Sequence, residues 1–243
     1  MQWNHLRHTI TDTLFTLIAP HRCICCNEYD HPLCDVCYHA LCAAQRTQHC
    51  HHCRRVITAD GSLCDTCRGT SVLRSVFVCS DAAHRTVLLR AIAAYKYHGI
   101  RALRTPLSRL MCHALQSAPL RIPDVIIPIP LHPWRERWRT FNQSAELAED
   151  LAQTLTPHLP LRVSPDALRR KRYTRAQARH ATRQERERNV HDAFTVHRPT
   201  IVRGANILLI DDVATTTATL RSAATALHHA GARRIDAAVL VRD

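Results

Sequence analysis

The feature that most constrains how this chain can fold is the spacing of its cysteines. Ten of the twelve cysteines fall between residues 23 and 67, and eight of them form four C-x2-C pairs. Two thiolates at this spacing lie on one tight turn and can bind a single Zn²⁺ at about 2.3 Å. The pattern predicts metal sites built from Cys23/Cys26, Cys34/Cys37, Cys50/Cys53 and Cys64/Cys67.

The spacing leaves open which pairs share a metal. Sequential pairing joins the first pair with the second and the third with the fourth, whereas crossed pairing joins the first with the third. One site could also be empty, so the sequence predicts one or two structural Zn²⁺ ions. A segment this short and polar buries little core, and the metal would supply most of its folding energy. With the thiolate pairs complete, we interpret His31, His49, His51 and His52 as surface or nucleic-acid-facing residues.

Residues 1–20 place apolar side chains on one helical face, interrupted by polar residues. A secretory signal has an uninterrupted apolar centre, so we expect an amphipathic helix here and a cytoplasmic protein. A cytoplasmic location also disfavours a disulfide framework. No apolar run approaches the roughly 20 residues of a membrane helix, so we expect no membrane insertion.

After the cysteine-rich segment, apolar runs alternate with helical periodicity. Strands are predicted at 75–79, 124–130, 206–210 and 235–241, and helices at 86–97, 105–117, 143–155 and 219–230. Residues 165–190 are highly charged and predict a loop-helix. Strands that alternate with helices indicate an α/β fold with a doubly wound, mostly parallel sheet.

The stretch ILLIDDVATTTAT at 207–219 has the order of a ligand site. An apolar strand ends at two carboxylates, Asp211 and Asp212, and a threonine-rich turn then opens a helix. Backbone N–H groups at a helix start favour a phosphate, and the hydroxyls of Thr215, Thr216 and Thr219 add donors. The carboxylates suit a ribose diol, or Mg²⁺ held beside it.

The charge of the chain points to anionic ligands. The net charge is +13, and 31 of the 33 basic residues are arginine. Arginine binds phosphate in a planar, bidentate geometry, so nucleic acid or a small molecule with several phosphates fits this excess.

These motifs together resemble the ComF family, whose members combine a four-cysteine zinc module with a type I phosphoribosyltransferase fold. The family is associated with DNA uptake in natural transformation. Besides the cysteine pairs, the resemblance rests on KYHG at 96–99, PIPLHP at 128–133, RERWRTFNQ at 135–143, RKRYTRAQ at 170–177, RERNVHDAF at 186–194 and LLIDDVATTTAT at 208–219. It implies a double zinc-ribbon module at 21–70 and a phosphoribosyltransferase-like domain at 75–243.

The resemblance also implies roles for individual residues toward phosphoribosyl pyrophosphate (PRPP) and Mg²⁺. Asp211 and Asp212 would contact the ribose hydroxyls, and 169–188 would form the flexible catalytic loop or a nucleic-acid track. The pyrophosphate would face three arginines, Arg135, Arg137 and Arg139. The 5′-phosphate would be bound by Val213, Ala214, Thr215, Thr216, Thr217 and Thr219.

Three positions depart from the glycine that the family pattern usually has, namely Thr140, Asp192 and Thr217. A glycine at position 217 would allow a positive φ or a close approach of the backbone to phosphate, which a β-branched residue resists. Two hypotheses therefore stay open. One is a PRPP-dependent phosphoribosyltransferase of unknown acceptor. The other is a non-catalytic protein that binds single-stranded DNA, stacks bases on its aromatic residues and works with DNA-uptake or recombination proteins.

Overall fold

The structure is a computed structural model, and it describes residues 22–29, 31–43, 49–53, 55–56, 63–67, 69–80, 83–118, 120–131, 141–156, 161–171 and 193–242. The helix predicted at 1–20 lies outside these residues and stays a prediction.

A parallel four-stranded sheet forms the centre of the fold. Its strands are β1 (Ser75–Val78), β2 (Val125–Pro128), β5 (Asn206–Ala214) and β6 (Arg234–Arg242), in the order β1-β6-β5-β2. All three neighbouring pairs are parallel. The middle strands are almost continuously apolar because helices cover both of their faces. The predicted α/β class and parallel sheet are confirmed.

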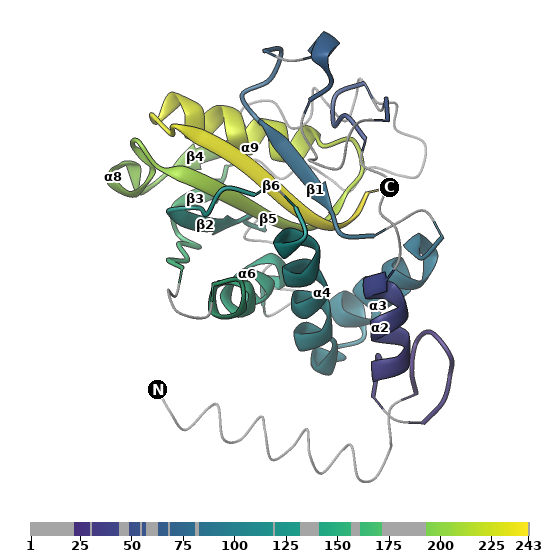
Figure 1. Ribbon diagram of the computed structural model, residues 1–243. Helices are drawn as coiled ribbons and strands as arrows, with labels where there is room; N and C mark the ends of the chain where they lie inside the picture. Colours follow the sequence, from purple (N-terminus) through teal and green to yellow (C-terminus); the bar gives the residue numbers. More distant parts are fainter. Residues whose placement is uncertain are drawn as a thin grey trace, which may run out of the picture.

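Helices pack on both faces of this sheet (Figure 1). Helices α3 (Arg85–Tyr97), α4 (Arg104–Gln116) and α6 (Gln143–Thr154) cover one face, and α9 (Ala218–His229) covers the other. The alternation along β5 follows from the period of a strand: Leu208 and Ile210 join the core of the three helices, whereas Ile207 and Leu209 join the core beneath α9. The short elements η2 (Arg101–Leu103) and α8 (Pro199–Val202) complete this part of the chain.

One prediction in the charged region was wrong. Within 165–190 we expected a loop-helix, but β3 (Leu168–Arg170) pairs antiparallel with β4 (Phe194–Val196). Leu168 and Phe194 bury their side chains in the α9-side core, which stabilises strands too short to show a period in the sequence. Residues 172–192 between them lie outside the described part of the chain.

The two cysteine-rich segments lie on different sides of the sheet (Figure 1). The first continues into α2 (Asp35–Ala43), whose Tyr38 and Leu41 join the core formed with α3 and α4. The second contains η1 (Asp65–Cys67) and makes a small buried cluster of its own beside the start of α9.

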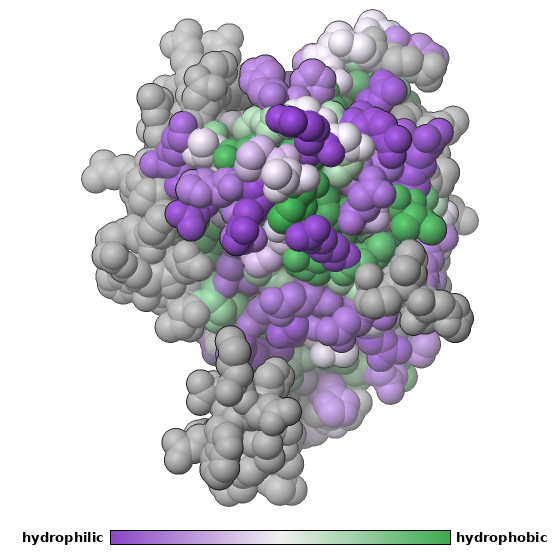
Figure 2. Space-filling model, turned by 90° about the vertical axis from the view of Figure 1, so that its left-hand side faces the viewer, coloured by the Kyte–Doolittle hydropathy of each residue, from purple (hydrophilic) through white to green (hydrophobic). Residues whose placement is uncertain are grey.

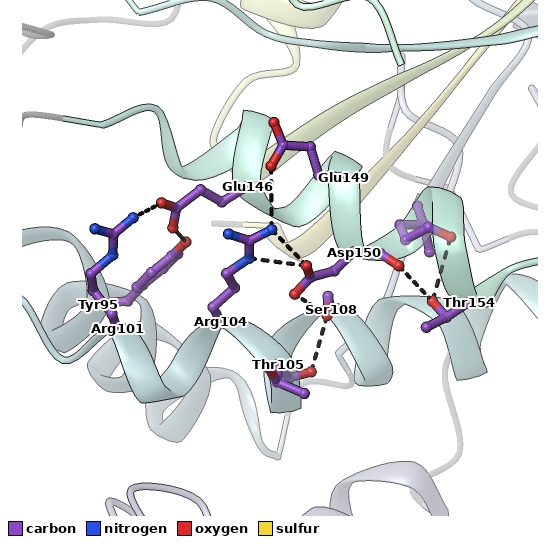
Figure 3. A network of polar contacts seen from close by, with 10 residues as sticks. Tyr95, Arg101, Arg104, Thr105, Ser108, Glu146, Glu149, Asp150 and Thr154 are labelled. Atoms are coloured by element: carbon purple, nitrogen blue, oxygen red, sulfur yellow. Dashed lines mark hydrogen bonds and ion pairs between the residues drawn. The ribbon is translucent and has the colours of Figure 1, made fainter. Parts of the chain in front are cut away.

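A network of polar contacts fixes α6 against the helices beside it (Figure 3). Glu146 accepts hydrogen bonds from the buried Tyr95 hydroxyl of α3 and from Arg101 of η2. Farther along α6, Asp150 accepts from Arg104 Nε at 3.0 Å and from its Nη2 at 2.6 Å, and from the Ser108 hydroxyl at 3.3 Å. The network holds α6 against α3, η2 and α4.

The face at the β2 edge of the sheet is mostly hydrophilic, with a smaller hydrophobic area among the polar side chains (Figure 2). Among the described residues, no helix combines the length and apolar character that a membrane span requires.

Candidate functional site

The twin aspartates lie inside β5 rather than after it. We expected the strand to end at residue 210, but β5 continues to Ala214 because β6 extends alongside it, with Asp211 opposite Val239 and Val213 opposite Val241. The turn that opens α9 begins at Thr215. The aspartates thus lie in the last residues of β5, and the threonine turn follows directly. Open α/β sheets bind ligands at the carboxyl ends of their strands.

Asp211 is held by the start of α6. Its Oδ1 accepts from the Ser144 hydroxyl at 3.1 Å and from the Asp212 N–H at 3.0 Å. Within the described part of the chain both hydrogen bonds go to Oδ1, which leaves Oδ2 for a ligand. Removal from water and the charge of Asp212 raise the pKa of Asp211 to about 7, although Lys96 and Ser144 act in the opposite direction.

Ser144 is placed by a helix cap that explains part of the RTFNQ motif. The Asn142 side chain accepts from the Ser144 N–H at 3.0 Å, which caps α6, and its Nδ2 donates to the Ile129 carbonyl at 3.2 Å. Asn142 therefore ties the start of α6 to the end of β2. Phe141 packs on Tyr95 with ring centroids 5.5 Å apart.

Asp212 is paired with a lysine that sequence reasoning did not assign to the site. Lys96 Nζ, from the last turn of α3, lies 2.6 Å from Asp212 Oδ1, and both side chains are largely buried. The sequence carried a signal, since Lys96 is one of only two lysines and opens the KYHG motif. Gly99, at the end of that motif, has φ +67° and follows the end of α3, a position where glycine is favoured.

The turn after β5 has the backbone shape for which the family usually uses glycine. Thr217 has φ 58° and ψ 5°, in the left-handed region, and directly precedes α9. The first turn of a helix leaves N–H groups without carbonyl partners inside the helix. Of these, the Ala218 N–H lies 3.4 Å from the Thr216 hydroxyl. The turn therefore presents amides and hydroxyls beside the two carboxylates.

The Thr217 side chain points to the second cysteine segment. Thr217 is buried, and its hydroxyl donates to the His51 carbonyl at 3.2 Å while lying 2.6 Å from the Thr216 carbonyl. The surface role we expected for His51 is wrong, because only 1% of this residue is exposed and its Nε2 is 3.0 Å from the Leu73 carbonyl. Burial lowers the pKa of His51 to about 4, which keeps the ring neutral.

The eight paired cysteines assemble into two groups of four. Cys23, Cys26, Cys34 and Cys37 bring their sulfurs within 4.8 Å of one another, and so do Cys50, Cys53, Cys64 and Cys67. The structure thus has the sequential pairing that the spacing left open. None of the twelve cysteines, all of which lie among the described residues, forms a disulfide.

The geometry of both groups fits a zinc ion. The Cys26 and Cys34 sulfurs are 3.8 Å apart, and those of Cys53 and Cys64 are 3.6 Å apart. A tetrahedron with Zn–S bonds of about 2.3 Å has an edge of about 3.8 Å. Burial opposes ionisation of the first thiol in each group, but backbone N–H groups lower the pKa of Cys23 and of Cys50 to about 6. Burial raises the pKa of Cys37 and of Cys67, so metal binding to either group would release protons.

The predicted diphosphate-binding arginines and most of the predicted catalytic loop are not among the residues that the structure describes. Arg135, Arg137, Arg139 and Thr140 lie outside the described residues, as do Asp192 and most of 169–188. Their predicted roles stay predictions.

The parallel sheet, whose central strand β5 carries paired aspartates before a turn at a helix start, together with the family match places this chain in the class of phosphoribosyltransferase-type proteins. The family model "Phosphoribosyl transferase domain" matches residues 142–243, which include α6, β5, the turn and α9. More particularly, this chain belongs to the ComF family, as its relatives show.

The DNA utilization protein YhgH of Escherichia coli O6:H1 is 31% identical, over 79% of this chain and 89% of the relative. Competence protein F of Haemophilus influenzae is 25% identical, over 91% of this chain and 96% of the relative. A solved structure of the allosteric regulatory enzyme of purine biosynthesis aligns with a TM-score of 0.37 and 19% identity, over 56% of this chain and 26% of that one.

Proposed function

We propose that this protein binds PRPP with Mg²⁺ at the carboxyl end of β5. The observation that carries the proposal is the continuity of the site: among the described residues no hydrogen bond occupies Asp211 Oδ2, and four residues later begins the turn that contains the left-handed Thr217 and opens α9. Asp211 and Asp212 hold the ribose hydroxyls, and the 5′-phosphate binds to the turn. The residues that contact this phosphate are Val213, Ala214, Thr215, Thr216, Thr217 and Thr219.

The physical chemistry supports this orientation of the ligand. A phosphate at the start of α9 meets backbone N–H groups and the positive end of the helix dipole. Carboxylate oxygens accept from the sugar hydroxyls and are ligands that Mg²⁺ prefers. The diphosphate then faces Arg135, Arg137 and Arg139, whose guanidinium groups suit several phosphate charges.

The reaction that such a site supports is transfer of the ribosyl 5-phosphate group to an acceptor. The bond from the anomeric carbon to the diphosphate breaks, the acceptor bonds to that carbon, and diphosphate leaves. Bound Mg²⁺ would supply positive charge to the departing diphosphate. The protein fixes the two ends of the substrate, and fixed positioning is a large part of such catalysis.

Calorimetric titration with PRPP and Mg²⁺ tests the binding proposal. We expect wild-type protein to bind, and D211N to bind at least about tenfold more weakly, because a charged hydrogen bond is worth about 1.5–3 kcal/mol. D166N is the matched control, since Asp166 is an exposed carboxylate paired with Arg198, and it should bind like wild type. Absence of binding heat for the wild-type protein at millimolar PRPP would overturn the proposal.

We further propose that the two cysteine groups hold structural Zn²⁺ and that the protein acts on single-stranded DNA in DNA uptake or recombination. The relatives' names, DNA utilization protein and competence protein, and the +13 charge support this role. Binding of a labelled oligonucleotide should weaken steeply with salt, because phosphate contacts release counterions. Salt-insensitive binding, or none at low salt, would exclude it.

A further inference from the structure

The second cysteine group touches the phosphate turn through its first C-x2-C turn, residues 50–53, which we term the knuckle. The His51 carbonyl accepts from the Thr217 hydroxyl and, at 3.2 Å, from Arg242 Nη2 at the end of β6. Arg242 Nη1 also lies 3.4 Å from the Cys50 carbonyl. Residues 166 positions apart in sequence thus meet directly at the turn that the aspartates precede.

The knuckle can hold a fixed position because it contacts β6, the segment before β1 and α9. His51 stands between two cysteines of one metal-ligating group, Cys50 and Cys53. Its ring is buried and bonded to the Leu73 carbonyl, just before β1. On the α9 side, the His52 ring lies 3.5 Å from Arg221. A metal in the group would fix the path of the knuckle backbone, and with it the His51 carbonyl.

Thr217 makes a side-chain hydrogen bond to the knuckle that a glycine at this position could not make. The left-handed region is strained for a β-branched residue, whereas glycine adopts that conformation freely. The Thr217 hydroxyl has one proton, shared between the His51 and Thr216 carbonyls at 3.2 and 2.6 Å. The hydrogen bond from the Thr217 hydroxyl to the His51 carbonyl, which we term the link, connects the turn to the second cysteine segment.

We propose that the second cysteine group is a positioning part of the phosphate site, so that metal bound by Cys50, Cys53, Cys64 and Cys67 strengthens anion binding through His51 and Thr217. This inference rests on the proposed function. The first group offers a contrast, because Cys23 and Cys34 pack into the core of α2, α3 and α4 on the other side of the sheet.

The test compares two variants that each remove one exposed cysteine from one group, C53S and C26S. We expect C53S to lose about one zinc per chain and to bind PRPP with Mg²⁺ about tenfold more weakly, the size of one lost positioning hydrogen bond. C26S should also lose about one zinc but weaken PRPP binding far less. Equal effects of the two variants on PRPP binding would overturn the proposal.

A second pair of variants addresses the link itself without disturbing either cysteine group. T217V keeps the β-branched shape but removes the hydroxyl, and T217S keeps the hydroxyl. We expect T217V to weaken PRPP binding about three- to tenfold, T217S to restore most of it, and T217V to add little in the C53S background. Additive losses from T217V and C53S would show that they act independently and would overturn the link.

Amide hydrogen exchange separates failure of this inference from failure of the proposed function. In the absence of PRPP, C53S and T217V should each speed exchange across 215–219, whereas C26S should not. If wild-type protein binds no PRPP, the proposed function falls but the exchange result still tests the link. If PRPP binds and exchange in this turn is the same in C53S and C26S, the function stands and the link is wrong.

Discussion

Asp211 is a residue whose charge depends strongly on its surroundings. Its pKa rises from an ordinary value near 4 to about 7 in the folded protein, because of burial and the charge of Asp212. The folded state therefore binds this proton more tightly than the unfolded state does. The contribution of Asp211 to stability is fully present below pH 4 and is lost as the pH rises through 7.

The D211N variant removes this titration. Wild type should lose stability from pH 5 to pH 8 as Asp211 ionises, whereas D211N should not. The free energy of unfolding of D211N minus that of wild type should therefore increase by at least about 1.4 kcal/mol over this range, the value of one pKa unit. Urea unfolding at the two pH values measures the difference. A gap between variant and wild type that stays constant with pH would mean that Asp211 titrates normally. In the proposed function, PRPP with Mg²⁺ requires the ionised carboxylate, so wild-type affinity should rise over the same pH range.

The pair between Lys96 and Asp212 joins two elements, α3 and β5. Removal of one partner from a largely buried pair leaves an uncompensated charge, so K96M should lower the free energy of unfolding by about 2–3 kcal/mol. D212N should cost a similar amount. The double variant should cost less than the sum, with a coupling of about 1–3 kcal/mol. Additive costs in chemical denaturation would indicate that the contact contributes nothing.

The ion pair between α4 and α6 can be tested against an exposed ion pair elsewhere in the fold. Arg104 reaches Asp150 with two nitrogens in a partly buried pair. R104M should cost about 1–2 kcal/mol, because among the described residues the Asp150 carboxylate would keep only its hydrogen bond from the Ser108 hydroxyl. R198M is the control, since the Arg198–Asp166 pair is about half exposed and should contribute less than about 0.5 kcal/mol. Equal melting temperatures for the two variants would contradict this ranking.

The elements also show what the sequence could and could not predict. Continuous apolar runs located every strand of the central sheet, because strands that are buried on both faces carry apolar side chains on both. The short β3 and β4 were missed, since three residues show no period. Lys96 was missed because its partner is 116 positions away. The positive φ of Thr217 was foreseeable from the motif, but its bond to His51 required the tertiary arrangement of a segment with no detectable link to the turn.

At the scale of the whole molecule, two cysteine groups bracket the sheet from opposite sides. We predict two zinc ions per chain in protein purified with its metal retained, and a lower melting temperature after chelation, because metal binding and folding of such segments are coupled. Metal analysis with thermal unfolding measures both. A zinc content below one per chain, or a melting temperature unaffected by chelation, would contradict a structural role for the metal.

The measurement that tests the central claim most directly is a crystal structure of the protein grown with PRPP and Mg²⁺. We predict the 5′-phosphate against the amides of 215–219, and the ribose hydroxyls within hydrogen-bond distance of Asp211 and Asp212, with the Thr217 side chain still directed to His51. A structure with PRPP bound elsewhere, or with the Thr217 side chain occupying the phosphate position, would contradict the account.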